Sequence, residues 1–346
     1  MARALVLGGT GAIGSAIARR LLTAGWTVDL VARDPKRLTP DLAEAGARFI
    51  AADRHDDAAL AAAYGAGADL LVDCLCFTAD HARQVLPFAE DATSTVVISS
   101  KAVYVDDAGR HVNSPAAPRF PGPIHETNPT LAPGSGDYNT REGYGANKVA
   151  AERVLLDSSA PVTILRASKV HGRGARPPRE WYFVKRVLDR RPHILLAARG
   201  IGADHPTAAA NLAALVETVA AQPGSRILNS ADPDAPTGRR IAAIIADHLN
   251  HSWTEILLDE TADPTLGNHP WNAGPPIVLD TTAGLNLGYR PVGDYAATVV
   301  DEIDRLVESA ATSPDGTWQL PGIDEDFFAD AFDYTAEDAS PYVSPR

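Results

Sequence analysis

Two kinds of hydrophobic pattern alternate through the first hundred residues of this chain: continuous apolar runs, and segments whose apolar residues recur at helical spacing. Short apolar runs have the length and composition of buried strands, and they lie at 3–7, 27–32, 47–51, 69–75 and 94–99. Segments with helical spacing separate them, beginning near residue 13 and continuing near 36–45, 56–63 and 79–90. Apolar strands joined by amphipathic helices form parallel sheets that are covered on both faces. The sequence therefore predicts an α/β fold built on a doubly wound parallel sheet.

The alternation weakens after residue 105. Residues 106–140 are rich in Pro and Gly and are expected to form a long functional loop. The expected elements that follow are a helix at 141–157, a strand at 162–166, an arginine-rich connection at 171–191, and helices at 207–221, 238–249 and 293–309. We expect residues 1–170, with part of 205–230, to form the sheet domain. Residues 171–310 would then form a smaller mixed α/β substrate lobe at the carboxyl side of the sheet.

Residues 311–346 form an acidic C-terminal tail. They hold eight acids against the single base Arg346, and so carry much of the net charge of −13. Aromatic residues spaced for a short docking helix lie within the tail at Phe327, Phe328, Phe332 and Tyr334. We interpret the segment as a solvated tail with one weakly held part, with a lid or partner-binding arm as the alternative.

Composition excludes several classes of function. The net charge of −13 argues against a nucleic-acid partner. No apolar stretch reaches the roughly 18 residues of a membrane span, and no secretory signal opens the chain. Cys74 and Cys76 are interpreted as buried thiols of a reduced, cytoplasmic protein. The His, Cys and acidic residues show no metal-ligand spacing, so no metal site is expected.

A glycine-rich turn lies between the first strand and the first helix. It reads Gly8, Gly9, Thr10, Gly11, Ala12, Ile13 and Gly14. The spacing of Gly9, Gly11 and Gly14 is that of a dinucleotide-binding turn. Gly9 would adopt a turn conformation closed to residues with a Cβ, Gly11 would admit a pyrophosphate, and Gly14 would let the helix pack closely on the strand. We therefore predict a Rossmann-type dinucleotide site, with a purely structural turn as the alternative.

Arg33 stands at the end of the second strand, where the adenosine ribose is normally recognised. An arginine at this point accommodates a 2′-phosphate, and Asp34 is better placed to cap the next helix. NADP(H) is therefore the expected cofactor, with NAD(H) possible and a surface role for Arg33 as the alternative. Asp53 follows the third strand and could accept a hydrogen bond from the adenine amino group, or could be a plain loop acid.

Ser100, Tyr144 and Lys148 are the candidate catalytic residues. Tyr144 and Lys148 are four residues apart, so they share one face of the expected helix. A phenol with an ordinary pKa near 10 is a poor acid or base at neutrality, but a nearby ammonium favours its ionised form. The tyrosine could then exchange a proton with a substrate oxygen, which a serine at the end of the fifth strand could hold.

These motifs together resemble the extended short-chain dehydrogenase/reductase superfamily, the NAD(P)-dependent epimerase/dehydratase-like proteins. The resemblance covers residues 1 to about 310 and rests on the ordered motifs at 8–14, 53, 99–104, 126–129, 144–148 and 165–172. It implies that Tyr144 is the acid/base, that Lys148 binds the nicotinamide ribose and that Ser100 orients the substrate. It also implies cofactor contacts from Cys76, Phe77, Ala167 and Val170, and a homodimer.

The sequence departs from the family at several positions. Lys101 and Ala102 stand where sugar dehydratases carry Asp-Glu, which disfavours dehydration. Ala167 replaces a usual proline, and His171 replaces the tyrosine that usually precedes the glycine at 172. Weak candidates for substrate contacts are His171, Arg173, Arg176 and His205. His171 could equally be a hydrogen-bonded structural residue.

The leading hypothesis is an NADP(H)-dependent oxidoreductase that reduces a carbonyl, or oxidises an alcohol, on a small polar substrate such as a sugar or specialised metabolite. The first alternative is a nucleotide-sugar epimerase that retains its NAD(P). The second, of another class, is a non-catalytic NADP(H)-sensing regulator.

Overall fold

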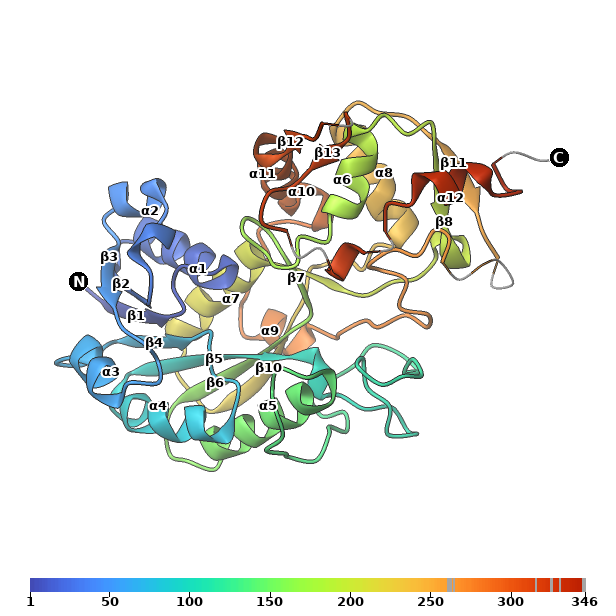
Figure 1. Cartoon of the computed structure of the whole chain (residues 1–346). Helices are drawn as coiled ribbons and strands as arrows, with labels where there is room; N and C mark the ends of the chain where they lie inside the picture. The colour runs from blue at the N-terminus through green and yellow to red at the C-terminus, as the bar shows by residue number, and fades with distance from the viewer. Residues whose placement is uncertain (260–262, 264, 315, 324–325, 330, 344–346) are drawn as a thin grey trace.

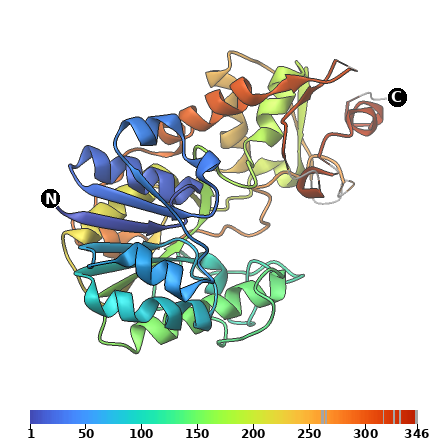
Figure 2. The same cartoon turned by 60° about the vertical axis from the view of Figure 1, so that its left-hand side comes forward.

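The computed structural model describes residues 1–259, 263, 265–314, 316–323, 326–329 and 331–343. A seven-stranded sheet forms the larger part, and a mixed lobe lies beside it (Figures 1 and 2). The strands are β1 (Arg3–Leu7), β2 (Thr27–Ala32), β3 (Arg48–Ala51), β4 (Leu70–Asp73), β5 (Ser94–Ser100), β6 (Val162–Ala167) and β10 (Arg226–Ser230). Their order is β10-β6-β5-β4-β1-β2-β3, and every pairing is parallel. The predicted Rossmann-type fold is confirmed.

Helices cover both faces of the sheet because its strands are apolar on both sides (Figure 1). One face packs on α1 (Ala12–Thr23) and α7 (Ala209–Ala220), and the other on α3 (Asp57–Tyr64), α4 (Ala79–Asp91) and α5 (Arg141–Leu156). Successive residues of β1 divide between the two cores. Val6 joins the core under α1, whereas Leu5 and Leu7 join the core under α4 and α5.

The lobe has its own apolar core. Its elements are α6 (Trp181–Leu188), α8 (Gly238–His248), α10 (Tyr295–Thr298), α11 (Val300–Ser309) and the parallel pair β8 (His193–Leu196) and β11 (Thr254–Leu257). Trp181, Phe183, Ile241 and Ile303 are buried at its centre. A second parallel pair, β7 (Lys169–His171) and β9 (Pro206–Ala208), lies between sheet and lobe (Figure 1). The helix α9 (Thr282–Asn286) packs beside β10.

Several elements differ from the sequence prediction. The expected helix at 36–45 is a 3₁₀ turn (Pro35–Arg37) followed by α2 (Pro40–Glu44), because Pro40 can begin a helix but cannot continue one. The expected helix at 293–309 is divided into α10 and α11. The arginine-rich connection contains α6, a buried helix that the prediction missed. Residues 106–140, all of them described, contain neither a helix nor a strand.

The C-terminal tail packs on the lobe, so its interpretation as a mainly solvated segment is wrong for the residues that the structure describes. The tail contains β12 (Ala311–Thr312), β13 (Trp318–Gln319), a 3₁₀ turn (Asp326–Phe328) and α12 (Tyr334–Ala339). Phe328 is buried in the lobe core, and the carboxylate of Glu337 pairs with the buried Arg186 at 2.6 Å.

Among the described residues, no helix combines the length and apolar character that crossing a membrane would require.

Candidate active site

The glycine turn brings α1 close to the carboxyl end of β1. The positive φ of the turn lies at Gly8 (φ 79) and not, as expected, at Gly9. A Cβ on Gly9 would lie 2.7 Å from Leu30 Cδ2, and one on Gly14 would collide with the Gly8 carbonyl oxygen. A Cβ on Gly11 would meet only Gly8 O, at 3.4 Å. The turn is therefore closed on the protein side and open at Gly11, where the amide groups of a helix N-terminus favour a phosphate.

A cavity of about 740 Å³ extends from this turn across the ends of β2 and β3. Its walls include the predicted cofactor residues Gly8, Thr10, Gly11, Arg33, Asp53 and Phe77, together with Arg37 and Tyr138, which the prediction missed. Arg33 is exposed and forms no ion pair within the described part of the chain. Asp34 accepts a hydrogen bond from Lys36 N at 2.9 Å, so it caps the following turn as predicted. The Asp53 carboxylate accepts one from His55 N.

A second cavity of about 1050 Å³ adjoins the first, and Gly8 and Gly11 line both. From the roles expected of their lining residues, the first is called the adenosine-side cavity and the second the substrate-side cavity. Ser100 and Tyr144 face it from the sheet side. Ala12, Ile13, Gly14 and Val170 also line it. On the opposite side are Asn268, His269 and Pro270 of the lobe and Phe327 of the tail. The cavity thus lies between the carboxyl end of the sheet and the lobe.

Ser100 and the neighbouring Ser99 have different roles in the structure. The Ser99 hydroxyl donates to Glu152, which pairs with Arg166 at 2.6 Å in the protein interior. The Ser100 hydroxyl accepts a hydrogen bond from Ala102 N at 3.1 Å and lies at the cavity wall. Alternation along β5 therefore presents only Ser100 to the cavity.

The start of α5 places Tyr144 opposite Ser100. Thr140 caps the helix by accepting a hydrogen bond from Gly143 N at 3.0 Å. Gly145 lets α5 approach the turn after Ser100, because a Cβ there would collide with the Ala102 carbonyl and lie 2.7 Å from Leu131 Cδ1. This close approach brings the phenol and the hydroxyl to the same cavity.

Lys148 lies one helical turn after Tyr144 and is almost fully buried. Its ammonium donates to the carbonyl oxygens of Cys76 at 2.8 Å and Ile98 at 2.9 Å, at the ends of two adjacent strands. The same nitrogen lies 4.3 Å from the Phe77 ring centroid and 5.9 Å from that of Tyr144. The two carbonyls hold the ammonium in the protein interior beside Phe77, and Lys148 itself lines neither cavity.

Comparison with known proteins identifies the family. The model of the NAD dependent epimerase/dehydratase family matches residues 4–197, more than half of the chain. The chain belongs to this family. Membership confirms the resemblance inferred from the motifs and makes the protein an NAD(P)-dependent enzyme of the oxidoreductase or epimerase type. No sequence among the curated proteins matches this chain.

Solved structures share the fold of this epimerase/dehydratase-family protein. A putative epimerase from Burkholderia cenocepacia J2315 is 21% identical, with a TM-score of 0.68 over 88% of this chain and 97% of that one. DesIV, a dTDP-glucose 4,6-dehydratase from Streptomyces venezuelae solved with NAD and TYD, is also 21% identical, with a TM-score of 0.66 and the same coverage. The UDP-N-acetylglucosamine 4-epimerase from Bacillus cereus is 16% identical, with a TM-score of 0.63 over 88% and 99% of the two chains.

Three of the remaining predicted residues, Ala167, Cys76 and Arg173, line neither of the two cavities. Ala167 is buried in the core under α1, and Cys76 is buried and contributes its carbonyl to Lys148. Burial and the nearby Asp73 carboxylate together raise the pKa of the Cys76 thiol to about 12, so the thiol is not a nucleophile. Arg173 lines a separate hollow beside α1 and α7, whereas Arg176 lines the substrate-side cavity as expected.

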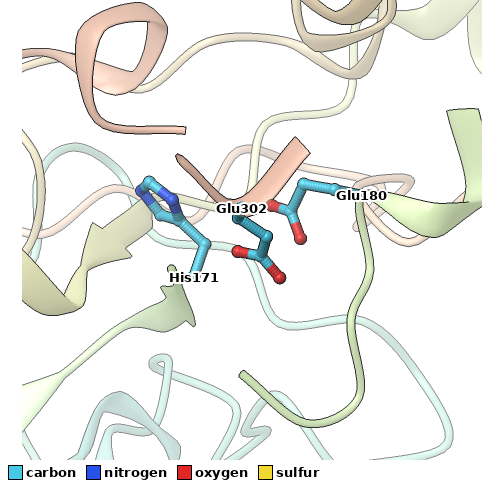
Figure 3. A group of neighbouring side chains, drawn as sticks. All are labelled: His171, Glu180 and Glu302. Carbon is cyan, nitrogen blue, oxygen red and sulfur yellow. The ribbon is translucent and has the colours of Figure 1, made fainter. Parts of the chain in front are cut away.

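Neither of the two predicted histidines contacts the cavity. His171 is buried, and its Nε2 lies 2.7 Å from the Asp232 carboxylate (Figure 3 shows its surroundings). His205 bonds the Asp232 carbonyl at 2.8 Å and accepts from Leu279 N at 3.1 Å. Neither ring lines the cavity, because both nitrogens of His205 are hydrogen-bonded inside the protein and Nε2 of His171 is held by Asp232. The structure therefore favours the structural alternative for His171 and gives no support to a substrate contact from either residue. Asp204, next to His205, faces the cavity instead.

The prediction also missed most of the charge around the substrate-side cavity. Its described lining holds a single acid, Asp204, and six cationic side chains: Arg37, Lys101, Arg141, Lys169, Arg176 and Arg179. Asp204 pairs with both Lys101 and Lys169, the latter at 2.7 Å. The only sequence signal for this set was the run of arginines after residue 171.

Proposed function

We propose that this protein is an NADP(H)-dependent oxidoreductase that reduces a carbonyl group on a small polar substrate carrying an anionic group. The observation that carries the proposal is that Ser100 and Tyr144 face one cavity whose wall also includes the dinucleotide turn. Bound NADPH would supply a hydride. Ser100 would hold the substrate oxygen and Tyr144 would donate the proton to it, because both residues line the same cavity.

Arg33 supports the preference for NADP(H). Its guanidinium lines the adenosine-side cavity, is exposed, and has no acidic partner among the described residues. Arg37 lies in the same wall, and so does Asp34, one of whose carboxylate oxygens accepts from the backbone of Lys36. Two guanidinium groups in one wall favour a phosphate, because planar guanidinium groups bind phosphate oxygens well.

The charge of the substrate-side cavity supports an anionic substrate. Four arginines and two lysines line it against one acid, in a chain whose net charge is −13. Burial lowers the pKa of both lysines, Lys101 and Lys169, and both already pair with Asp204, so the arginines supply most of the surplus positive charge. The cofactor pyrophosphate would occupy the part next to the glycine turn. Lys101 lines the same cavity as Ser100, so its amino group, which pairs with Asp204, would lie near a carboxylate or phosphate of a substrate bound there.

A nucleotide-sugar epimerase with retained cofactor is the second candidate. The family model is named for epimerases and dehydratases, and the similar structures include enzymes of both kinds. A reductase consumes NADPH in proportion to product, whereas an epimerase leaves the absorbance of the reduced cofactor unchanged over many turnovers. A panel of carbonyl compounds with and without acidic groups, followed at 340 nm with NADPH and with NADH, therefore tests the proposal. Binding of NADPH with no turnover of any compound by wild type would favour the regulator instead. Homodimerisation stays a prediction.

The first variant to test cofactor choice is Arg33→Ala. We expect the KM for NADPH to rise about tenfold or more, because a charge-assisted hydrogen bond to the 2′-phosphate contributes about 1.5–3 kcal/mol. The KM for NADH should stay unchanged. Lys36→Gln, in the exposed turn beside Arg33, is the control and should alter neither value. Equal affinity of wild type for NADH and NADPH in calorimetric titrations would refute the preference.

Lys101→Met tests the charge of the substrate. The Asp204 carboxylate keeps its contact with Lys169 in this variant, so the cavity retains an internal ion pair. We expect the KM of an acidic substrate to rise about tenfold to a hundredfold. The KM of its neutral ester or dephosphorylated analogue should change little. If both forms lose affinity equally, Lys101 has a structural role and the anionic-substrate proposal fails.

A further inference from the structure

Three potential metal ligands, His171, Glu180 and Glu302, meet at the junction between the sheet and the lobe (Figure 3). They come from separate elements: His171 ends β7, Glu180 precedes α6, and Glu302 lies in the first turn of α11. One ligand atom from each lies within 4.8 Å of the other two, and each residue is at most 2% exposed. The group lies outside the lining of the substrate-side cavity, so the proposed reaction does not use it.

The two carboxylates have no ion-pair partner in direct contact among the described residues, although Arg179 and Arg305 lie near enough to act on Glu302 electrostatically. Within the described part of the chain, neither Glu180 nor Glu302 has a cationic side chain within 4.0 Å. The other buried glutamates differ, since Glu152 and Glu337 each pair with an arginine at 2.6 Å. Glu180 accepts a hydrogen bond from the Tyr295 hydroxyl at 3.2 Å, and one oxygen of Glu302 accepts from Gly172 N. The other oxygen of Glu302, Oε1, is buried without a hydrogen-bond partner among the described residues.

His171 is oriented as metal-binding histidines are. Its Nε2–H donates to the Asp232 carboxylate at 2.7 Å, which leaves the lone pair of the ring on Nδ1. Nδ1 is buried and has no hydrogen-bond partner in the described part of the structure. A carboxylate behind one ring nitrogen fixes the tautomer and makes the other nitrogen a better ligand.

We propose that Nδ1 of His171 and the carboxylates of Glu180 and Glu302 bind a divalent transition-metal ion, with Zn²⁺ the best match to one nitrogen and two oxygen ligands. Two glutamates balance the charge of such an ion. Ligand atoms around a tetrahedral zinc ion lie about 3.4 Å apart, so modest side-chain rotations would close the set on an ion. The ion would join the lobe to the sheet and so stabilise the relative position of the two cavity walls.

This inference reverses the expectation from the sequence. The three residues are far apart in the chain, so no ligand spacing marks them, and the fold alone brings them together. The clearest signal in the sequence is His171 itself, which stands where the family usually carries tyrosine.

The test begins with the full-length wild type produced in zinc-supplemented medium and measured for bound metal by mass spectrometry. We expect one zinc ion per chain. Unfolding and refolding with a chelator should lower the Tm, and refolding with zinc should restore it. His171→Tyr, a residue that the family accommodates at this position, and Glu302→Gln should each lower bound zinc about tenfold or more. Asp304→Asn is the control on the same helix, because Asp304 pairs with His248 at the surface, and it should keep the ion.

Three results would overturn the proposal. Wild type free of zinc after growth and refolding in zinc would show that a proton, and not a metal ion, holds the two carboxylates together. If the Glu302→Gln variant has the same Tm and the same amount of bound metal as wild type, Glu302 is not a metal ligand. Equal loss of zinc in the Asp304 control would assign the binding to the surface. Should both cluster variants fail to fold, cobalt-loaded wild type supplies the readout: visible d–d absorption supports the site, and its absence contradicts it.

Discussion

Replacing Tyr144 by phenylalanine should lower kcat about 10²- to 10⁴-fold, the usual contribution of a positioned general acid. The change removes one oxygen atom from the cavity wall and leaves the ring beside Phe77, with centroids 6.4 Å apart. Affinity for NADPH should be unaffected, since the glycine turn and Arg33 are untouched. Stopped-flow decay of NADPH absorbance on any carbonyl compound that wild type reduces measures the first quantity, and calorimetric titration measures the second.

Tyr138→Phe is the matched control for this experiment. Tyr138 stacks on the same Phe77 ring, with centroids 5.4 Å apart and planes 9° apart, but it lines the adenosine-side cavity. Its hydroxyl is absent from the wall that Ser100 and Tyr144 share. Retained kcat in Tyr138→Phe together with loss in Tyr144→Phe would assign proton transfer to Tyr144. Comparable kcat in Tyr144→Phe and wild type would remove the central residue of the proposed mechanism.

The sheet domain was predictable because its signals are local. Each strand of the sheet must be apolar on both faces, and each covering helix must present one apolar stripe. Both patterns can therefore be recognised in short stretches of sequence. The same holds for the glycine turn and for Tyr144 and Lys148, whose spacing on one helix already places them together. The spacing of the glycines did not show that the positive φ lies at Gly8, where a Cβ would lie 2.9 Å from the Leu75 side chain, and not at Gly9.

The lobe and the site's charges were less predictable because their determinants are distant in sequence. The helix α6 was hidden by Lys185 and Arg186, residues that are rarely buried. Arg186 is buried because Glu337, from the tail, supplies its counter-charge. Lys101 and Lys169 meet Asp204 only after the lobe folds onto the sheet. A single sequence shows these residues as ordinary surface charges.

Breaking the buried pair between α6 and the tail should have the largest effect on stability. The side chains of Arg186 and Glu337 are 2% and 7% exposed, and the Arg186 guanidinium also lies 3.9 Å from the Tyr182 ring centroid. Glu337→Gln leaves a buried cation without its counter-charge, so the free energy of unfolding should fall by about 3–5 kcal/mol. Urea denaturation followed by tryptophan fluorescence measures the loss, because Trp181 and Trp271 are buried in the same lobe core.

The adjacent Asp338→Asn separates this effect from a general change of charge in the tail. Asp338 is half exposed and pairs with Arg191, which is largely buried but keeps Glu337 at 3.6 Å when Asp338 is removed. Its removal should therefore cost clearly less than that of Glu337, about 1 kcal/mol. A large loss in Glu337→Gln with a small one in Asp338→Asn would show that the tail is part of the lobe's folding unit. The consequence would reach the substrate-side cavity, because the segment that Glu337 anchors also carries Phe327 into its wall. Equal and small losses in both variants would mean that the docked tail contributes little to the fold, and that Phe327 reaches the cavity without help from this ion pair.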